Sequence, residues 1–346
     1  MFFIWAKIGE LKFPLFLPIH VIINNISKLE RLGNRTTMNK SEIKKGTFHA
    51  GFSYFLWGLL PIYWKLIDQV SAFEILANRI FWSFIFMILV LLLTRRWRLF
   101  TQTLKGFAQN KKQLYALAIA SLLISINWFV YIWAVNSGHM LEASLGYYIN
   151  PLVSVLLGMI VLKEKLSIAQ YISFGLATIG VLIISISHGK FPWIAISLAL
   201  SFGLYGLAKK LINVESAVGL TLETLVVAPI AAIYMCFLFI NGTNSFLSAS
   251  AVTDLLLIGA GAATAVPLLY FAKGAQKIPL SLLGFLQYIA PTLTLILGVF
   301  VYKEHFSKTQ LLSFIFIWSA LTIYSLSKTK LFPQRGLNIQ KEKLNG

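Results

Sequence analysis

The sequence predicts an all-α integral membrane protein with ten transmembrane helices, arranged as a 5+5 inverted-repeat bundle. Of its 346 residues 58% are hydrophobic and only 12% are charged, whereas soluble domains carry about 25% charged residues. The apolar residues form long runs, and a helix needs roughly 20 such residues to cross the hydrocarbon core. Helices are expected because an open sheet would leave backbone polar groups unpaired in lipid.

The expected spans follow one another with short links, so neighbouring helices should pack antiparallel. They are Thr47–Leu66, Phe73–Thr94, Leu114–Val135, Ala143–Leu162, Ile168–Ile186, Phe191–Ala208, Leu220–Ile240, Thr253–Ala272, Pro279–Val301 and Lys308–Ser327. Residues 44–187 form the first five-helix repeat in this plan, and residues 191–328 form the second. Residues 329–346 are expected to be a basic cytoplasmic tail.

Residues 1–37 do not fit the plan of ten spans. Their apolar stretch, Phe13–Ile26, is too short to cross a bilayer and is interrupted by two prolines. No small-residue cleavage site follows it, as a signal peptide would require. A short polar and basic segment begins at Met38, just before the first span. We therefore expect residues 1–37 to be a disordered N-terminal extension or a misassigned start.

The positive charges predict the orientation in the membrane. The formal net charge is +18, but the lysines and arginines lie in alternate links between spans and do not cluster on a polar domain, which argues against nucleic acid as a partner. Counted from Met38, 20 of them fall on the side of the N-terminus, including Lys209 and Lys210 in the link after the sixth span, and 4 fall on the other side. This asymmetry predicts a multi-pass protein of the bacterial inner (cell) membrane with both termini cytoplasmic.

The two halves of the chain are related by a repeat at an offset of 140 residues. Tyr148–Pro151 falls on Tyr288–Pro291, and 15 of the 40 positions from Tyr148 to Ser187 are identical without a gap. Five helices per copy is an odd number, so the second copy enters the membrane in the opposite sense. Inverted repeats of this kind are typical of transporters whose substrate site lies between the copies.

These features resemble a known family. The repeat, with a proline in its fourth span, a closing glutamate and a following span, resembles the EamA domain of the drug/metabolite transporter superfamily. The run from Asn127 to Pro151 is NWFVYIWAVNSGHMLEASLGYYINP, and it is similar to the RarD-type members, described as chloramphenicol-sensitivity permeases. The resemblance covers roughly Lys44 to Lys328, and residues 1–37 depart from it because family members start near the position of Met38. It implies a transport role and no particular substrate.

A proline stripe on the fourth and ninth spans is the first candidate for a substrate site. A proline has no N–H group and displaces the carbonyl four residues earlier, so one carbonyl in each span is expected to be free. Irregular backbone near the midplane is tolerated where it lines a cavity. The alternative is a kink whose polar residues join helices. The residues of this stripe are Tyr147, Asn150, Pro151, Ser154 and Gly158 in the fourth span, and Gln287, Ala290, Pro291, Thr294 and Gly298 in the ninth. Of these, Tyr147, Asn150, Pro151, Gln287 and Pro291 are the candidate substrate-binding residues.

Arg79 is the most notable charge inside a predicted span. It lies about six residues into the second span, where a charge costs a few kcal/mol. Its planar fork suits a carboxylate or phosphate of the substrate. The alternatives are snorkelling to the interface and a structural pair with Glu74 or Glu142.

Further residues are expected to complete the site. Asn127 and Tyr131 lie four residues apart on the third span, which places them on one helix face. We expect them to supply polar contacts. The rings of Trp57 and Tyr205 are expected to close the cavity.

The remaining predictions concern four glutamates. Glu74 and Glu223 are candidates for proton coupling, because a partly desolvated carboxylate can carry a proton; the favoured alternative is a place at helix ends in the interface. Glu164 and Glu304 are interpreted as structural turn residues. Each precedes a Ser-x-x-Gln sequence that fits the capping box of the next helix.

The predicted function is a secondary transporter (permease) that moves a small metabolite or drug-like molecule by alternating access. A membrane-embedded lipid-modifying enzyme is the alternative, but the sequence has no Asp-x-x-Asp pair and no histidine pair at ligand spacing. It also has no Walker A sequence, and its single cysteine, Cys236, supports no disulfide or cysteine-based metal site. We expect no enzyme activity, no metal and no cofactor. The expected partners are a small-molecule substrate and the lipid bilayer, with no nucleic acid, and a homodimer is left open.

We predict that reporter fusions after Lys112 and after Gly242 give opposite signals, because the two positions fall on opposite sides of the membrane in this topology. A phosphatase reporter should be active only after Gly242, and a fluorescent protein only after Lys112. Identical signals at the two positions would contradict the ten-span topology.

Overall fold

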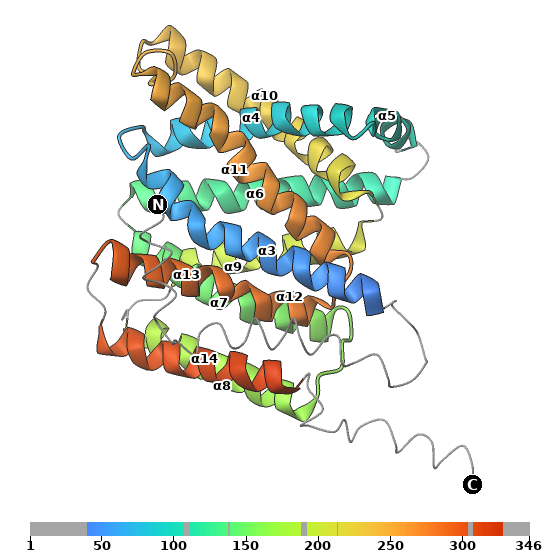
Figure 1. The fold of residues 1–346 in the computed structure, drawn as a ribbon, viewed down its shortest axis with the longest axis vertical. Helices are drawn as coiled ribbons and strands as arrows, with labels where there is room; N and C mark the ends of the chain where they lie inside the picture. The colour runs from blue at the N-terminus through green and yellow to red at the C-terminus, as the bar shows by residue number, and fades with distance from the viewer. Residues whose placement is uncertain are drawn as a thin grey trace, which may run out of the picture. The chain divides into compact units, whose positions relative to one another are not determined.

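The computed structural model describes residues 40–106, 111–137, 139–187, 192–212, 214–303 and 307–327. The predictions for residues 1–37, for the tail at 329–346 and for Glu304 lie outside the described residues. Within them the chain is helical and has no strand. The helices are α3 (Lys40–Lys65), α4 (Ala72–Leu93), α5 (Trp97–Gly106), α6 (Lys111–Asn136), α7 (Met140–Ile160), α8 (Ile168–Ser187), α9 (Trp193–Leu211), α10 (Ser216–Ile240), α11 (Ala251–Ala275), α12 (Leu280–Gln287), α13 (Ile289–Ile296), the π-helix η3 (Leu297–Val301) and α14 (Lys308–Ser327) (Figure 1).

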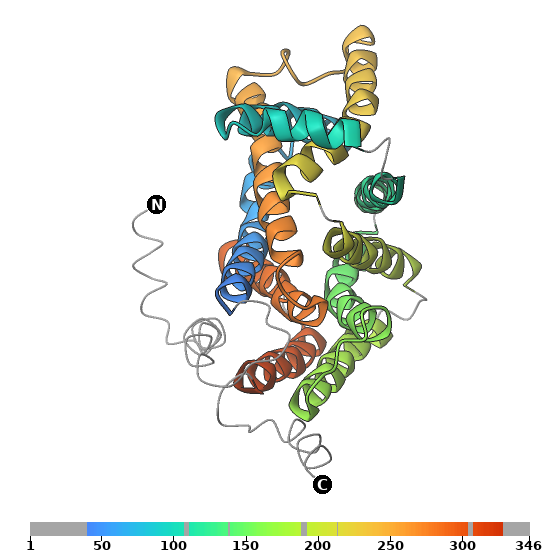
Figure 2. The ribbon, with the colours of Figure 1, turned by 90° about the vertical axis from the view of Figure 1, so that its right-hand side faces the viewer.

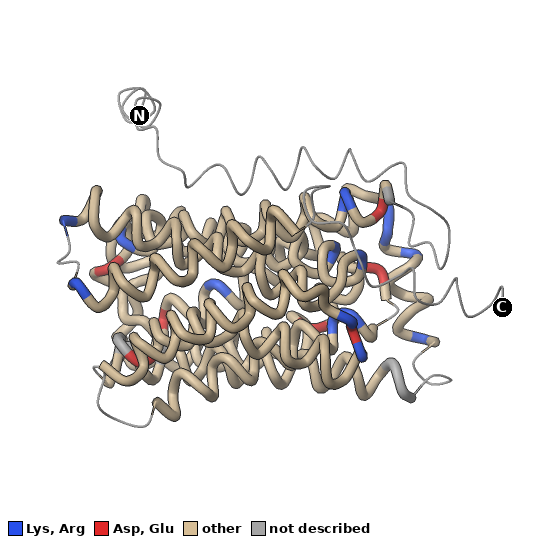
Figure 3. Tube along the Cα trace, turned by 90° about the horizontal axis from the view of Figure 1, so that it is seen from below, with Lys and Arg blue, Asp and Glu red and all other residues tan. Residues whose placement is uncertain are grey.

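The predicted all-α membrane fold is confirmed. Among the described residues, nine helical segments are long and apolar enough to cross a bilayer. The remaining expected span is α3, which has 26 residues but is less apolar, because it begins with lysines and contains His49 and Pro61. Charged residues gather mainly near the helix ends, and other residues fill most of the length between them (Figure 3). Each of the ten expected spans thus coincides with a helix or a run of consecutive helices.

The described helices belong to two compact units. The larger unit contains residues 45–164 and 185–306, and the smaller one contains α14 and α8 up to Ile184. The units therefore differ from the sequence repeats, since the last helix of each repeat belongs to the smaller unit. Within that unit α8 and α14 lie side by side (Figure 2), and the Ser313 hydroxyl donates a hydrogen bond to the Gly180 carbonyl at 2.6 Å. A Cβ at Gly180 would lie 2.8 Å from the Ser313 carbonyl, so the glycine permits this close contact.

The turns that follow the fourth and ninth spans begin alike. Lys163 and Lys303 both adopt the left-handed conformation, with φ of 54° and 59°, which is uncommon for a residue other than glycine. After α7 the Glu164 amide donates at 3.0 Å to the carbonyl six residues earlier, which satisfies a free carbonyl at the helix end. Both predicted capping boxes form: the amides of Ser167 and Ser307 each donate at 2.8 Å to the glutamine side chain three residues later.

The ninth span is broken near its proline. It consists of α12, α13 and η3, with the first break between Gln287 and Ile289. Pro291 has no N–H group for the Gln287 carbonyl, which explains why the helix is interrupted there. By contrast, α7 continues past Pro151 from Met140 to Ile160. The two repeat-related prolines therefore have different effects on the backbone.

The helix α5 lies in the segment that the sequence placed in the link between the second and third spans. Phe100 is its buried residue, and Trp97 packs beside it with ring centroids 5.2 Å apart. The other residues of α5 include Arg98, which is exposed. An amphipathic helix with basic and aromatic residues suits the surface of a membrane.

Helix α4 packs closely against α11 at Gly261. A Cβ at this glycine would lie 2.6 Å from the carbonyl oxygen of Trp82 and 2.5 Å from its Cβ. The Ser83 hydroxyl donates a hydrogen bond to the Gly261 carbonyl at 2.9 Å. The two backbones therefore approach each other directly, as small residues allow in membrane helix pairs.

We predict that Gly261→Ala lowers the thermal stability of the detergent-solubilised protein, because the added methyl group has to displace the Trp82 backbone. Overpacking of this kind costs about 1–3 kcal/mol, and thermal unfolding followed by size-exclusion fluorescence would measure the change. The matched control is Gly175→Ala on α8, where a Cβ meets nothing within 4 Å. The control should keep or raise stability, because alanine favours helix over glycine. A Gly261→Ala protein as stable as the wild type would contradict the close contact.

Candidate functional site

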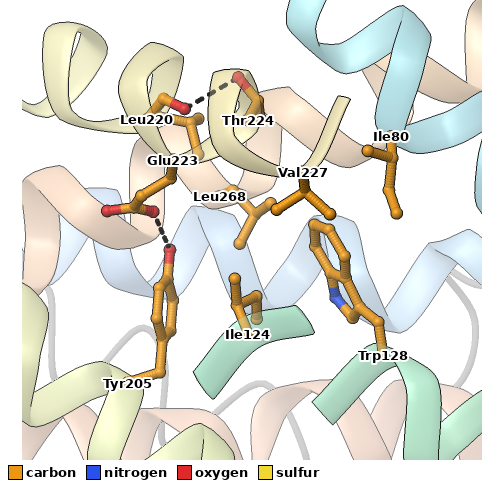
Figure 4. A pocket seen from close by; sticks show the side chains of 9 residues that line it. All are labelled: Ile80, Ile124, Trp128, Tyr205, Leu220, Glu223, Thr224, Val227 and Leu268. Carbon is orange, nitrogen blue, oxygen red and sulfur yellow. Dashed lines mark hydrogen bonds between the residues drawn. The ribbon is translucent and has the colours of Figure 1, made fainter. Parts of the chain in front are cut away.

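A narrow pocket lies inside the larger unit, among α4, α6, α9, α10 and α11 (Figure 4). Its lining residues are Ile80, Ile124, Trp128, Tyr205, Leu220, Glu223, Thr224, Val227 and Leu268. Leu220, Glu223, Thr224 and Val227 come from α10. Residues three, four and seven positions after the first of them share its face of the helix. The space between the side chains admits about one water molecule in this conformation. The walls are mostly apolar.

Glu223 is the acidic residue of the pocket wall, and two side chains of α9 hold it. Its Oε1 lies 2.6 Å from Lys209 Nζ, and its Oε2 accepts a hydrogen bond from the Tyr205 hydroxyl at 3.1 Å. The side chains of Lys209 and Glu223 are only 3% and 2% exposed. Buried charges are tolerated when they are paired and hydrogen-bonded, which this network achieves. The pocket therefore presents a carboxylate whose charge is already balanced.

The buried position of Lys209 corrects the sequence analysis. Lys209 was counted as a charge of the link after the sixth span, which was wrong, because it lies in the last turn of α9 and is buried. Its neighbour Lys210 donates to the Ile278 carbonyl at 2.6 Å. A signal for the true role of Lys209 was available, since it follows Tyr205 by four residues, and this spacing places both on one helix face.

Aromatic rings from α3, α9 and α11 pack behind Tyr205. Tyr205 stacks on Phe271 with ring centroids 5.8 Å apart, and Trp57 lies 5.6 Å from the same ring. Tyr54 and Phe202 complete the cluster. Of the two rings expected to close the cavity, Tyr205 forms part of the pocket wall and Trp57 stands one ring behind it.

Arg79 lies beside the pocket, with its guanidinium between Trp64 and Trp128. Its Cζ is 5.1 Å and 5.3 Å from the two ring centroids, within the range of cation–π attraction. Its Nε donates a hydrogen bond to the Thr264 hydroxyl at 3.1 Å. Thr264 is only 1% exposed and lies in the middle of α11, so the guanidinium points into the bundle instead of snorkelling to the interface.

Tyr131 and Tyr147 complete the surroundings of Arg79. Both phenol groups lie near the guanidinium, and their ring centroids are 6.0 Å apart. Tyr147 is 49% exposed, so its ring reaches the surface of α7. Within the described part of the chain, no carboxylate lies within the 4.0 Å ion-pair distance of Arg79, so the structural pair with Glu74 or Glu142 is not formed. The structure thus brings together three predicted residues from α4, α6 and α7.

The faces of the proline stripe pack directly on each other where α7 meets α12. The Ser154 hydroxyl donates a hydrogen bond to Gln287 Oε1 at 3.3 Å, and a Cβ at Gly284 would lie 2.7 Å from the Pro151 carbonyl. Asn150 is buried, and its Oδ1 has no hydrogen-bond partner among the described residues. Helices α7 and α12 are therefore in direct contact here, and neither helix contributes a residue to the pocket lining.

Asn127, Glu74 and Glu164 bind groups outside the pocket lining. Asn127 Nδ2 donates at 2.9 Å to the Leu198 carbonyl and at 2.9 Å to the Ser201 hydroxyl, which ties α6 to α9. Glu74 Oε1 accepts from two backbone amides of the link between α10 and α11, at 2.6 and 2.9 Å. Glu164 accepts from two amides of the first turn of α12, at 2.6 and 2.9 Å, where the helix dipole favours a negative charge.

Most residues of the pocket wall are not among the site residues predicted from the sequence. Trp128 was noted only as a neighbour of Asn127, although it touches both the pocket and Arg79. Apolar residues such as Leu268 carry no signal that separates a pocket wall from a lipid-facing surface, because both are equally hydrophobic. Trp128 could have been predicted from its position, because it lies on the third span together with the candidate residues Asn127 and Tyr131.

Known proteins resemble this chain over most of its length. Residues 44–186 and 191–326 each match the family described as the EamA-like transporter family. The uncharacterized transporter YojE of Bacillus subtilis (strain 168) is 51% identical, covering 85% of this chain and 97% of that protein. Protein RarD of Escherichia coli (strain K12) is 43% identical, covering 83% and 96%. One crystal structure with 19% sequence identity has a similar fold, with a TM-score of 0.59 over 81% of this chain and 96% of that one.

We predict that Lys209→Met destabilises the protein by about 3–5 kcal/mol, because it leaves a buried carboxylate without its partner. The double variant Lys209→Met/Glu223→Gln should lose less stability than the two single variants together, since no unpaired charge remains. Thermal unfolding of the four proteins in one double-mutant cycle would measure this coupling.

The matched control for this cycle is Lys65→Met. Lys65 pairs with Asp68 at 3.4 Å, but both side chains are more than half exposed, at 64% and 60%. Its loss should change stability by about 1 kcal/mol or less. Purely additive losses at Lys209 and Glu223 would show that the two side chains do not act as a pair.

Proposed function

The chain belongs to the EamA-like transporter family, and from this membership we propose that it is a secondary transporter that moves a small metabolite across the bacterial inner membrane by alternating access. It is a multi-pass membrane protein with nine strongly apolar helical segments among its described residues. The excess of lysine and arginine on one side of the spans supports a cytoplasmic location for both termini. The relatives bear the names of transporters, which supports transport over enzyme activity.

The observation that carries this proposal is the buried carboxylate of Glu223 on the wall of an otherwise apolar pocket. Replacing a buried ion pair by apolar residues is often neutral or stabilising, so stability alone does not explain Lys209 and Glu223. Ionisable residues inside a membrane bundle commonly mark substrate or ion pathways. A pocket that admits about one water molecule suits a closed conformation, which has to widen before a metabolite can enter.

Glu223 is the better placed of the two candidates for proton coupling. It borders the pocket and has a cation within 2.6 Å, so a proton would compete with Lys209 for the carboxylate. Glu74 instead binds two backbone amides of a link. In the proposed cycle, Lys209 balances Glu223 while the pocket is empty, and Tyr205 orients the carboxylate.

We predict that proteoliposomes containing the purified protein exchange at least one compound of a panel of small metabolites and drug-like molecules, tested with and without a pH gradient. Thr224→Leu should slow this exchange about tenfold or more, because the larger side chain fills the pocket. One methylene more or less in an apolar binding pocket is worth about 1–3 kcal/mol, and each 1.4 kcal/mol is a factor of ten. Among the residues that the structure describes, the Thr224 hydroxyl bonds only to carbonyls of its own helix, so its loss leaves no distant partner there unpaired.

The matched control is Thr322→Leu on α14, an exposed threonine that also bonds to a carbonyl of its own helix. It should exchange the same compound at the wild-type rate. Exchange no faster than in empty liposomes, for every compound of the panel, would overturn the proposed function. Wild-type rates in Thr224→Leu would place the transport site outside this pocket.

A further inference from the structure

Arg79 is a cation inside a membrane-spanning helix, and no described neighbour balances its charge. It lies in α4, between Ala72 and Leu93, where a charged side chain is costly and usually faces a partner or a cavity. Lys209, a buried cation of α9, is paired with the pocket residue Glu223 at 2.6 Å. Over the ranges that the structure describes, Arg79 has no such carboxylate within 4.0 Å.

The guanidinium of Arg79 has hydrogen-bond donors to spare. It carries five N–H groups, and among the described side chains only Thr264 accepts from it, at Nε. Trp64 and Trp128 lie against the group, at 5.1 Å and 5.3 Å from Cζ to the ring centroids. The edge with the two terminal nitrogens is therefore available, and this edge can bind both oxygens of a carboxylate at once.

Two tyrosines lie near this guanidinium. Tyr131 and Tyr147 are its neighbours on α6 and α7, and a phenol hydroxyl can donate a hydrogen bond to an oxyanion. Tyr147 is 49% exposed, so one side of the cluster lies at the surface of α7. Trp128 touches Arg79 and also lines the pocket, so the cluster and the pocket are separated by a single ring.

From these contacts we infer that Arg79 binds the carboxylate of the transported molecule, and that the substrate class is an organic monocarboxylate with a planar apolar body. The single positive charge of Arg79 balances one negative charge, whereas a dianionic phosphate ester would leave a second charge uncompensated in a poorly hydrated site. Once the pocket has widened, the ring of Trp128 and the apolar pocket walls would pack against the planar body. This inference rests on the proposed transport function and names the substrate class for the same region.

Three matched probes test the substrate class: 3-phenylpropionate, its neutral amide and phenyl phosphate. Binding to the purified protein is measured by calorimetry, and exchange of the same probes is measured in proteoliposomes. The wild type should bind the carboxylate at least about tenfold more tightly than the amide, because hydrogen bonds to charged groups are about twice as strong as neutral ones. This comparison needs no variant, so it stands even if a substitution impairs folding.

Arg79→Lys keeps the charge and removes the planar fork. It should weaken binding of the carboxylate about tenfold and leave binding of the amide unchanged. The matched control is Arg98→Lys, at an exposed position on α5, and it should bind all three probes like the wild type.

Several results would overturn the inference. They are equal affinity of the wild type for the carboxylate and the amide, tighter binding of phenyl phosphate than of the carboxylate, wild-type affinity in Arg79→Lys, and no binding of the carboxylate at all. Each of these leaves the transport function standing if the proteoliposomes still exchange another compound of the metabolite panel. Exchange of no compound at all would overturn the transport function itself.

Discussion

The constraint on which this structure depends is the cost of charge and of unpaired polar groups in hydrocarbon. The larger unit meets it in three ways. Glu223 is balanced by Lys209, Glu74 accepts two backbone amides, and Arg79 lies between two indole rings with one hydroxyl partner. Of these three groups, Glu223 lines the pocket and Arg79 contacts its wall residue Trp128. At these two places a ligand could replace a protein group as the partner of the charge.

Helix packing sets the geometry of this region. Ser83 follows Arg79 by one helical turn, and it bonds to the Gly261 carbonyl, which is one turn from Thr264. The same interface that brings the backbones of α4 and α11 together therefore also fixes the register of Arg79 opposite Thr264. Gly261 thus helps to position the Arg79 guanidinium, because the close approach that this glycine permits leaves α4 and α11 little freedom to slide.

Most of the fold was predictable from the sequence, and the site only in part. Apolar length, alternation of charge and the internal repeat are properties of the chain itself, so they predicted the spans. The cluster at Arg79 was anticipated because a charge inside a span is rare. The pocket was not anticipated, since its wall residue Leu268 resembles any lipid-facing leucine, and Lys209 looked like a loop residue beside another lysine. Pro151 and Pro291 match in sequence, yet only the second lies by a helix break, because the surrounding packing decides how a proline is accommodated.

The separation of bonded partners along the chain has a consequence for biosynthesis. Lys209 and Glu223 are 14 residues apart, so a nascent chain carries both into the membrane as one helical hairpin, already able to neutralise each other. Arg79 and Thr264 are 185 residues apart, so α4 must enter the bilayer long before its partner on α11 has been synthesised. The many leucines, isoleucines and phenylalanines of α4 offset the unfavourable insertion of its arginine during that interval. The apolar surface of α4 thus serves the order of membrane insertion as well as the finished bundle.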